Sequence, residues 1–194
     1  MSPPSEFADP PTALESPEFS PEERKLLLSL AHQSIQASLH GRNIDVRPPS
    51  SHLAEPRGAF TTLHLQGKLR GCIGYVLASQ PLYRTIAETA RAAAFDDPRF
   101  QPVTPDEAPD LKVEISVLSV PQPISSECVV LGKHGLIVAQ GSRRGLLLPQ
   151  VPVEWGWDRE TFLSQTALKA GLAPDAWRTG ADLQAFTAEI FGEE

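Results

Sequence analysis

The segment Arg70-Gly71-Cys72-Ile73-Gly74 holds the residue types best suited to chemistry. A cysteine thiolate is a strong nucleophile, and a nearby guanidinium charge favours the thiolate over the neutral thiol. Arg70 stands two residues before Cys72, so in a regular strand both side chains share one face. Glycine inside a strand marks a bulge or a place where another group approaches the backbone closely. The segment therefore predicts a shaped surface around Cys72, with Arg70, Gly71, Ile73 and Gly74 as binding residues.

A nucleophilic thiol needs a base to accept its proton and an acid to orient that base. His134, within Gly132-Lys133-His134-Gly135, and His64 are the candidate bases, and Glu114 is the candidate acid. The hypothetical catalytic set is therefore Cys72, His134 and Glu114. Structural roles remain open for all three, because a free cysteine packs as a small hydrophobe, a histidine between glycines suits a turn, and Glu114 could be a solvated carboxylate on a sheet face.

A second group of candidate binding residues follows Pro149. Gln150, Glu154 and Trp157 place an aromatic ring beside a carboxylate, which could form one wall of a binding groove. The alternative is that the tryptophans cover a boundary between lobes while Asp158 caps a helix.

Other clusters predict structure rather than chemistry. Arg91 and Arg99 flank Asp96-Asp97-Pro98, which favours an Asp–Arg network around that turn, with capture of a substrate carboxylate by Arg99 as the alternative. The five histidines and two cysteines show no spacing typical of a metal site, so we predict neither a metal nor a cofactor.

Cys72 must be positioned by a hairpin. The runs Ala59–Leu65 and Leu69–Val76 are rich in apolar residues and surround Gln66-Gly67, which is typical of a two-residue turn. That turn would place Cys72 opposite Thr61. A slip of one residue would move Cys72 to the other face of the sheet.

The remaining elements follow from caps, periodicity and glycine stops. The pattern predicts helices from Ser20 to Gly41, from Ser79-Gln80-Pro81 to just before Asp97, and from Asp158 to Gly171, and strands at Leu111–Val120, Gly135–Gln140, Gly145–Val151 and Leu183–Phe191. The last of these could also form a helix, although its alternation favours a closing strand. The fold class is α+β, with a mainly antiparallel sheet flanked by about three helices.

Composition narrows the function. Six of the 24 acidic residues, and none of the 17 basic ones, lie in residues 1–23, so residues 24–194 carry a net charge of only −1. This balance argues against nucleic-acid binding. The chain shows no apolar run of membrane-spanning length, no signal peptide and no disulfide framework, so we expect a cytoplasmic protein without membrane contact. Residues 1–19, rich in proline and acid, are predicted to be a mobile tail before a domain of residues 20–194.

Seven segments in order resemble a known family. They are Arg57-Gly58-Ala59-Phe60, Leu69-Arg70-Gly71-Cys72-Ile73-Gly74, Ala94-Phe95-Asp96-Asp97-Pro98-Arg99-Phe100, Val113-Glu114-Ile115-Ser116, Gly132-Lys133-His134-Gly135-Leu136, Leu147-Leu148-Pro149-Gln150-Val151 and Lys169-Ala170-Gly171-Leu172. Together they resemble the AMMECR domain, whose prokaryotic members are called AmmeMemoRadiSam system protein A.

The resemblance covers residues 20–194 and implies a two-lobed α+β domain with a cleft near Cys72. It also implies association with a Memo-like protein and a radical-SAM enzyme. Family members often carry a cysteine where this chain has Ala167, which argues against two-thiol chemistry here. Three hypotheses follow: an accessory protein that binds a partner, a small molecule or a modified substrate in the cleft; an enzyme that uses Cys72 as nucleophile or as the acid/base partner of His134 in group transfer; and an RNA-binding module.

Overall fold

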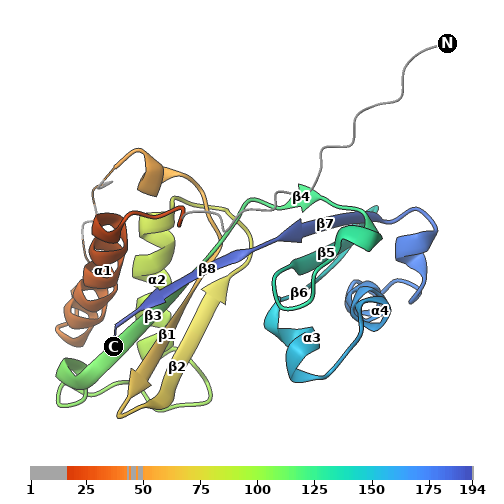
Figure 1. The fold of residues 1–194 in the computed structure, drawn as a ribbon. Coiled ribbons are helices and arrows are strands. Elements are labelled where there is room, and N and C mark those ends of the chain that lie inside the picture. Colours follow the sequence, from red (N-terminus) through yellow and green to blue (C-terminus); the bar gives the residue numbers. More distant parts are fainter. Residues whose placement is uncertain (1–16, 43, 45–46, 48–49, 194) are drawn as a thin grey trace.

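The computed structural model describes residues 17–42, 44, 47 and 50–193, which form two lobes (Figure 1). The first lobe is a four-stranded antiparallel sheet in the order β2-β1-β3-β8, and two helices cover one of its faces. Its elements are α1 (Pro21–Leu39), β1 (Ala59–Leu65), β2 (Lys68–Tyr75), α2 (Leu82–Phe95), β3 (Leu111–Leu118) and β8 (Ala188–Gly192).

The second lobe is another four-stranded antiparallel sheet, in the order β4-β7-β5-β6, with α4 packed on β5 and β6. Its elements are β4 (Gln122–Pro123), β5 (Gly135–Gln140), β6 (Arg143–Leu147), α3 (Gln150–Glu154), α4 (Arg159–Lys169) and β7 (Asp182–Phe186). The predicted α+β class with antiparallel pairing is confirmed, although the strands form two sheets and the short helix α3 is additional. The strand expected to reach Val151 ends at Leu147, because Pro149 caps α3.

Local sequence explains why α1 and α4 begin where they do. The Ser20 hydroxyl accepts a hydrogen bond from the Glu23 amide, and the Glu23 carboxylate accepts one from the Ser20 amide, which completes a capping box. The Asp158 carboxylate caps α4 in the same way through the Thr161 amide. Both predicted starts are confirmed.

The boundary between tail and domain needs correction. Phe19 is only 1% exposed and belongs to the core of the first lobe, where its ring stacks on His52 at 4.9 Å. Glu18 pairs with Arg57, and its amide donates to the Glu189 carboxylate. The folded domain therefore begins before Phe19, because an aromatic ring among proline and acidic residues still gains from burial. Residues 1–16 of the predicted tail lie outside the described residues.

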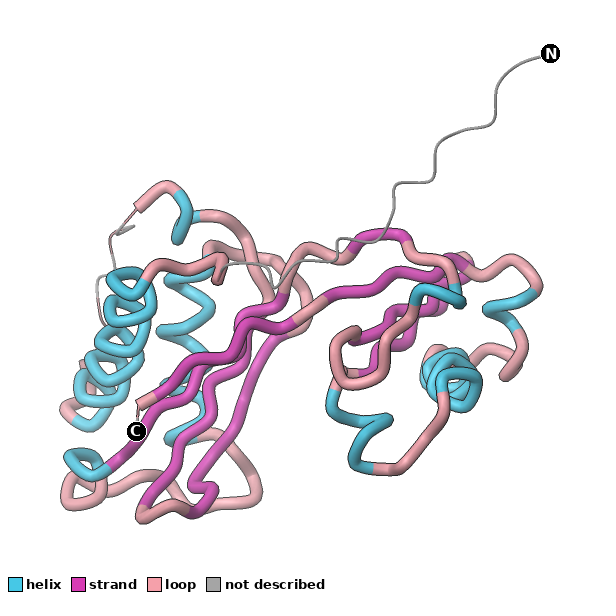
Figure 2. Tube along the Cα trace, viewed as in Figure 1, coloured by secondary structure: helices cyan, strands magenta, loops and turns pink. Residues whose placement is uncertain are grey.

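The C-terminal segment links the two lobes. Instead of one strand over Leu183–Phe191, the chain forms β7 in the second sheet and β8 in the first, separated by Thr187 (Figure 2). The amide of Ser119, which follows β3, donates to the Thr187 carbonyl at 2.9 Å, and the Thr187 amide donates to the Ser119 hydroxyl at 2.9 Å. Two chain segments thus cross between the lobes and bond to each other there. A propensity argument could not reveal that one run of residues serves two sheets.

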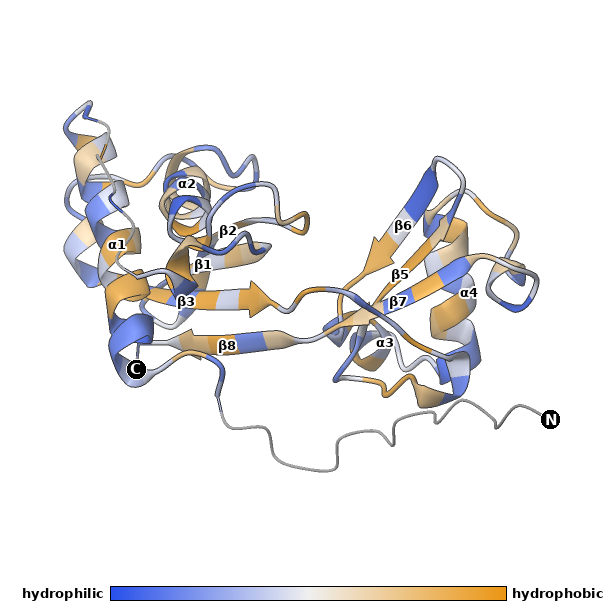
Figure 3. Cartoon of the chain, turned by 90° about the horizontal axis from the view of Figure 1, so that it is seen from above, coloured by the Kyte–Doolittle hydropathy of each residue, from blue (hydrophilic) through white to orange (hydrophobic). Residues whose placement is uncertain are grey.

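An apolar cluster also holds the lobes together, and we call it the junction cluster. It consists of Leu118, Ile137 and Phe186, with Phe60, Val76, Leu146, Leu148 and Ala188 packed against them. Along β5, Ile137 points to one face of the sheet, whereas its neighbours Leu136 and Val138 point to the other. Leu136 and Val138 pack in apolar clusters that include residues of α4. The junction cluster therefore lies on the sheet face turned away from α4. Seen from above, β3 and β8 of the first lobe extend toward β5 and β7 of the second (Figure 3).

Candidate functional site on the first sheet

A bulge in the first hairpin decides which way Cys72 points. The turn is the predicted two-residue Gln66-Gly67, with positive φ at both positions. The register shifts between Leu63 and His64, so that Arg70 has no partner and Cys72 lies opposite Thr62. The predicted pairing of Cys72 with Thr61 is therefore wrong, and the error reverses its face, since Thr61 is fully buried against Thr89 of α2.

Close packing against α2 accounts for the glycine before Cys72. A Cβ atom at Gly71 would overlap the carbonyl oxygen of Ala93 in α2. Backbone cannot move aside as a flexible side chain can, so only glycine fits here. With Gly71 on the covered face, Cys72 belongs to the face that α1 and α2 leave uncovered, where it is half-buried.

Polar side chains stand beside Cys72 across three strands. Thr62 of β1 donates a hydrogen bond from its hydroxyl to the Cys72 sulfur at 3.3 Å. Glu114 of β3 is the next residue in the row, opposite Thr62. Both Thr62 and Glu114 are half-buried. Two strand spacings, about 10 Å, separate the backbones of Glu114 and Cys72. The carboxylate shares the face of the thiol, and no hydrogen bond joins the two side chains in the described part of the chain.

An Asp–Arg clamp holds the backbone of Cys72 at the sheet edge. The Asp97 carboxylate accepts from the Cys72 amide at 2.9 Å, and the Arg99 guanidinium donates to the Cys72 carbonyl at 3.3 Å. Arg99 also binds Asp97 through its Nη2 atom at 2.7 Å. Because β2 is an edge strand, these outward backbone groups would otherwise be open to another strand. The clamp satisfies both groups and fixes the position of Cys72.

The clamp carboxylate is charged in spite of its burial. The side chain of Asp97 is only 2% exposed. The hydrogen bonds from the Arg99 side chain, opposed by burial and reinforced by the Cys72 and Arg99 amides, hold the pKa of Asp97 far below its usual range. The predicted network is present, since Arg91 also pairs with Asp96 at 2.6 Å. Its contact with the Cys72 backbone was not predicted, because it joins residues 25 positions apart.

Arg70 does not serve the thiol as its spacing suggested. Its guanidinium donates to both carboxylate oxygens of Glu107 at 3.0 Å and to the Pro102 carbonyl at 3.4 Å. The hydrogen bonds from Arg70, together with that from the Thr104 amide, lower the pKa of Glu107 to about 2. Arg70 therefore ties β2 to the segment before β3. The cation that contacts Cys72 is Arg99.

The predicted base His134 lies in the second lobe, immediately before β5. Its Nδ1 atom accepts a hydrogen bond from the Val130 amide at 3.1 Å, so the neutral ring carries its proton on Nε2. Burial, together with the positive charge of Lys133, lowers the pKa of His134. Among the described residues, no hydrogen bond or ion pair joins His134 to Cys72 or Glu114. His64, the other candidate, lies on β1 opposite Lys112.

The remaining predicted binding residues separate into two kinds. Ile73 packs against the first-lobe core, and Gly74 lies under the ring of Phe60, where a Cβ atom would overlap it. Trp157 packs in the second-lobe core and stacks on Trp155 at 6.0 Å. Gln150 and Glu154 are exposed at the two ends of α3. The structure thus brings Cys72 and Glu114 onto one face and leaves the α3 residues in the other lobe.

The described residues contain neither a cluster of metal-ligand side chains nor a helix of membrane-spanning character. Within them, no three His, Cys, Asp or Glu side chains gather closely enough to hold a metal ion. None of their helices combines the length and apolarity that crossing a membrane would require.

The two antiparallel sheets and their helices make this chain a two-lobed α+β protein. The sequence matches the family described as AMMECR1 over residues 28–191, and the chain belongs to this family. It is 44% identical over 185 residues to Protein MK0488 of Methanopyrus kandleri, with 89% of each chain covered. A protein of Methanothermobacter thermautotrophicus is 42% identical over 187 residues, covering 91% of this chain and 97% of that one.

A solved structure supports the fold. The crystal structure of uncharacterized protein PH0010 from Pyrococcus horikoshii matches with a TM-score of 0.68 and 43% identity. The match covers 87% of this chain and 90% of that chain. The resemblance inferred from the seven segments is thereby confirmed.

Proposed function

We propose that this chain is an accessory binding protein of a Memo- and radical-SAM-linked system. In this proposal the uncovered face of the first sheet, around Cys72, receives the partner or its modified substrate. In this proposal the face forms one side of a cleft between the lobes. The family resemblance supplies the choice of partners, and the geometry around Cys72 supplies the choice of surface.

One observation carries the proposal. A cysteine on an edge strand is held by Asp97 and Arg99 through its backbone, which leaves its side chain half-buried on the uncovered face. The clamp combines the buried carboxylate of Asp97 with the half-exposed guanidinium of Arg99, and its bonds to the amide and the carbonyl of Cys72 restrict the backbone that carries the thiol. Preorganised surfaces of this kind bind with a smaller entropic cost.

Calorimetric titration with the purified Memo-like protein and the purified radical-SAM enzyme of the same organism tests the proposal. We expect binding to at least one of them. Thr62→Lys, which adds a long charged side chain beside Cys72, should weaken it more than tenfold, whereas Cys72→Ala should change it less than about threefold. The matched control is Arg143→Gln, on an exposed residue of the second lobe. The proposal fails if neither protein binds or if Thr62→Lys binds like the unmodified chain.

A second candidate function is group transfer with Cys72 as nucleophile. The hydrogen bond from Thr62 to the sulfur favours it, since a donor stabilises a thiolate. His134 would then need to approach from the second lobe as the acid/base partner, with Glu114 on the face of the thiol.

Alkylation with iodoacetamide, followed by mass spectrometry over pH 6–10, separates the two functions. Cys128 is exposed and serves as the internal standard for an accessible thiol. A nucleophilic Cys72 would react in the native chain at a lower pH than Cys128, and Thr62→Val would remove that difference. If Cys72 reacts only after unfolding, the enzyme hypothesis is excluded and the binding function stands alone.

A further inference from the structure

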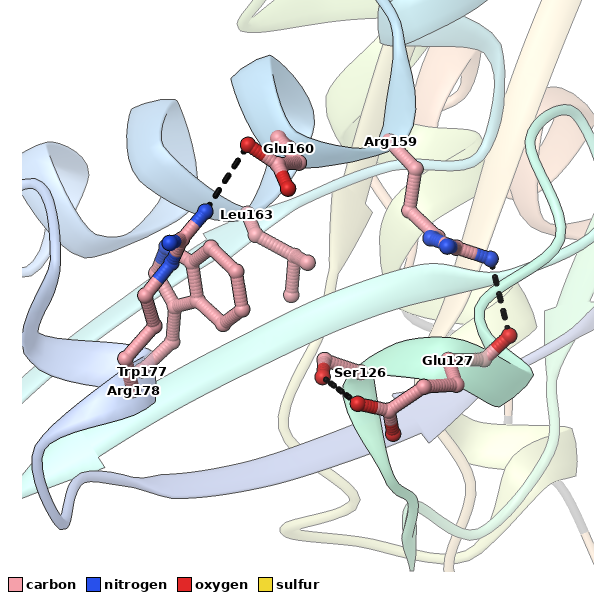
Figure 4. A pocket seen from close by; sticks show the side chains of 7 residues that line it. All are labelled: Ser126, Glu127, Arg159, Glu160, Leu163, Trp177 and Arg178. Carbon is pink, nitrogen blue, oxygen red and sulfur yellow. Dashed lines mark hydrogen bonds and ion pairs between the residues drawn. The ribbon is translucent and has the colours of Figure 1, made fainter.

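A cavity of about 460 Å³ lies in the second lobe, between the start of α4 and two short 3₁₀ helices (Figure 4). Its lining residues come from η3 (Ser126–Cys128), α4 and η4 (Ala176–Arg178), and are Ser126, Glu127, Arg159, Glu160, Leu163, Trp177 and Arg178. The volume falls within the range of small-molecule sites. None of these residues belongs to the Cys72 face.

Arg159 is the lining residue with the most unused hydrogen-bonding capacity. Its guanidinium donates to the backbone carbonyl of Glu127 at 2.9 Å. In the described part of the chain this is its only hydrogen bond, and it forms no ion pair there. The Glu127 carboxylate instead accepts from the Ser126 hydroxyl at 3.0 Å and is turned away from Arg159 (Figure 4). A guanidinium with free donors beside a cavity matches the two oxygens of a carboxylate.

The opposite wall is preorganised and partly apolar. Arg178 pairs with Glu160 at 2.8 Å and lies over the Trp177 ring at 4.4 Å. The Trp177 indole N–H also donates to the Ser164 hydroxyl at 3.4 Å, so the ring is held from two sides. The side chain of Leu163, which is 1% exposed as a residue, reaches down between Trp177 and Arg159 (Figure 4). Leu163 therefore closes the floor of the cavity, and an apolar body would lie against the Trp177 ring.

From these observations we propose that the cavity binds a small organic monoanion, with its carboxylate on Arg159 and its planar or aliphatic body against Trp177. The lining contains two arginines and two glutamates, so its formal charge is zero. A ligand with a single negative charge would give Arg159 an acidic partner, which this guanidinium lacks in the described part of the chain. Because the lining carries no net positive charge, a dianion gains no extra attraction there and loses more hydration than a monoanion, which favours a carboxylate over a phosphate.

Titration of the full chain with benzoate, followed by ¹H–¹⁵N NMR, tests this site. The three tryptophans give three indole N–H signals, which Trp→Phe variants assign. We expect a saturable shift of the Trp177 signal with millimolar benzoate and little shift of the Trp155 signal. Benzamide, the neutral analogue, should bind at least fivefold more weakly.

Substitutions test whether the guanidinium of Arg159 is the group that binds the carboxylate. Arg159→Gln should weaken benzoate binding at least fivefold, and Arg159→Lys should recover part of the loss. Arg143→Gln is the matched control, because Arg143 is also exposed and also donates to a backbone carbonyl, that of Gly171 at 3.1 Å. The absence of a saturable shift, equal binding of benzamide, or an equal loss in Arg143→Gln would each overturn the proposal.

Discussion

The Asp97 carboxylate remains charged in the interior because hydrogen bonds replace the water it has lost. Two come from backbone amides, of Cys72 and Arg99, and the Arg99 guanidinium supplies the rest. Removing one partner from such an arrangement leaves the other groups without compensation, which costs more than the net value of the interaction. The clamp is therefore a sensitive point for both stability and the position of Cys72.

We expect Asp97→Asn to lower the free energy of unfolding by about 2–4 kcal/mol, because the amide offers one acceptor atom where the carboxylate offers two. Asp96→Asn is the control. Asp96 is 51% exposed in its side chain and pairs only with Arg91, so its loss should cost less than about 1 kcal/mol. Urea unfolding at pH 7 measures both. Equal effects of the two variants would show that the clamp contributes no more than a surface ion pair.

The charge of Asp97 also predicts how the free energy of unfolding changes at acidic pH. The pKa of Asp97 is lower in the folded chain than in the unfolded chain, so its contribution is complete above the unfolded pKa of about 3.9 and declines as pH falls below it. The stability difference between the unmodified chain and Asp97→Asn should therefore shrink between pH 5 and pH 2. A difference that stays constant over this range would contradict the assigned charge.

For His52 we predict the opposite dependence of stability on pH. Burial alone would lower its pKa, but hydrogen bonds and charges from Glu23 and Glu18 outweigh burial and raise it. A raised pKa stabilises the fold below the unfolded value of about 6.5, and this contribution is lost as pH rises through the folded value. We expect His52→Gln to reduce the melting temperature more at pH 6 than at pH 8.5. A loss of melting temperature that is equal at the two pH values would contradict this assignment.

At the scale of elements, the segment before α1 is part of the fold. Phe19 contacts the core, and its ring lies 6.2 Å from that of Phe191 in β8. Phe19→Ala should lower the free energy of unfolding by about 3–5 kcal/mol, the usual cost of removing a buried aromatic ring. Leu26→Ala, on a residue of α1 that is 48% exposed, should cost less than about 1 kcal/mol. Denaturant unfolding measures both. Equal losses would mean that Phe19 is not anchored.

Turn chemistry and caps predicted most elements closely, because these signals are local. Ala59–Leu65 and Gly135–Gln140 match their strands, and Ser20 and Asp158 cap their helices. Gly71 indicated a bulge or a close approach of backbone, but it did not show that Arg70 would be the unpaired residue. The close approach of Ala93 to Gly71 appears only in the packing. A pattern of period two could place Cys72 in a strand but could not decide its face.

The sequence predicted the strand that carries Cys72, but not the residues that contact it. Two glycines around one cysteine identified the strand, and the alternation of β3 placed Glu114 on the outer face. The partners Thr62, Asp97 and Arg99 reach Cys72 from other elements. Sequence proximity instead suggested Arg70, whose charge belongs to Glu107. Long-range pairing of charged side chains leaves no trace in local spacing.

At the scale of the whole molecule, the junction cluster should make the two lobes unfold together. All three tryptophans, residues 155, 157 and 177, lie in the second lobe, and both tyrosines, residues 75 and 83, lie in the first. We expect the tryptophan fluorescence and the tyrosine near-ultraviolet signal to give coincident urea transitions. Phe186→Ala, in the junction cluster, should shift both equally. Separate midpoints would show that the lobes are independent.

The crossing at Thr187 has a consequence for biosynthesis. The first sheet acquires its fourth strand only when Ala188–Gly192 has been made. The strand β7, which precedes this segment, belongs to the other sheet, where it pairs with β4 and β5. Until the ribosome has made residue 192, the outer edge of β3 has no partner, and an open edge invites pairing with other nascent chains. Neither sheet can be completed before residues 182–192 have been made. We expect the two sheets to be completed in one step once this segment is available, and the edge of β3 to need shielding until then.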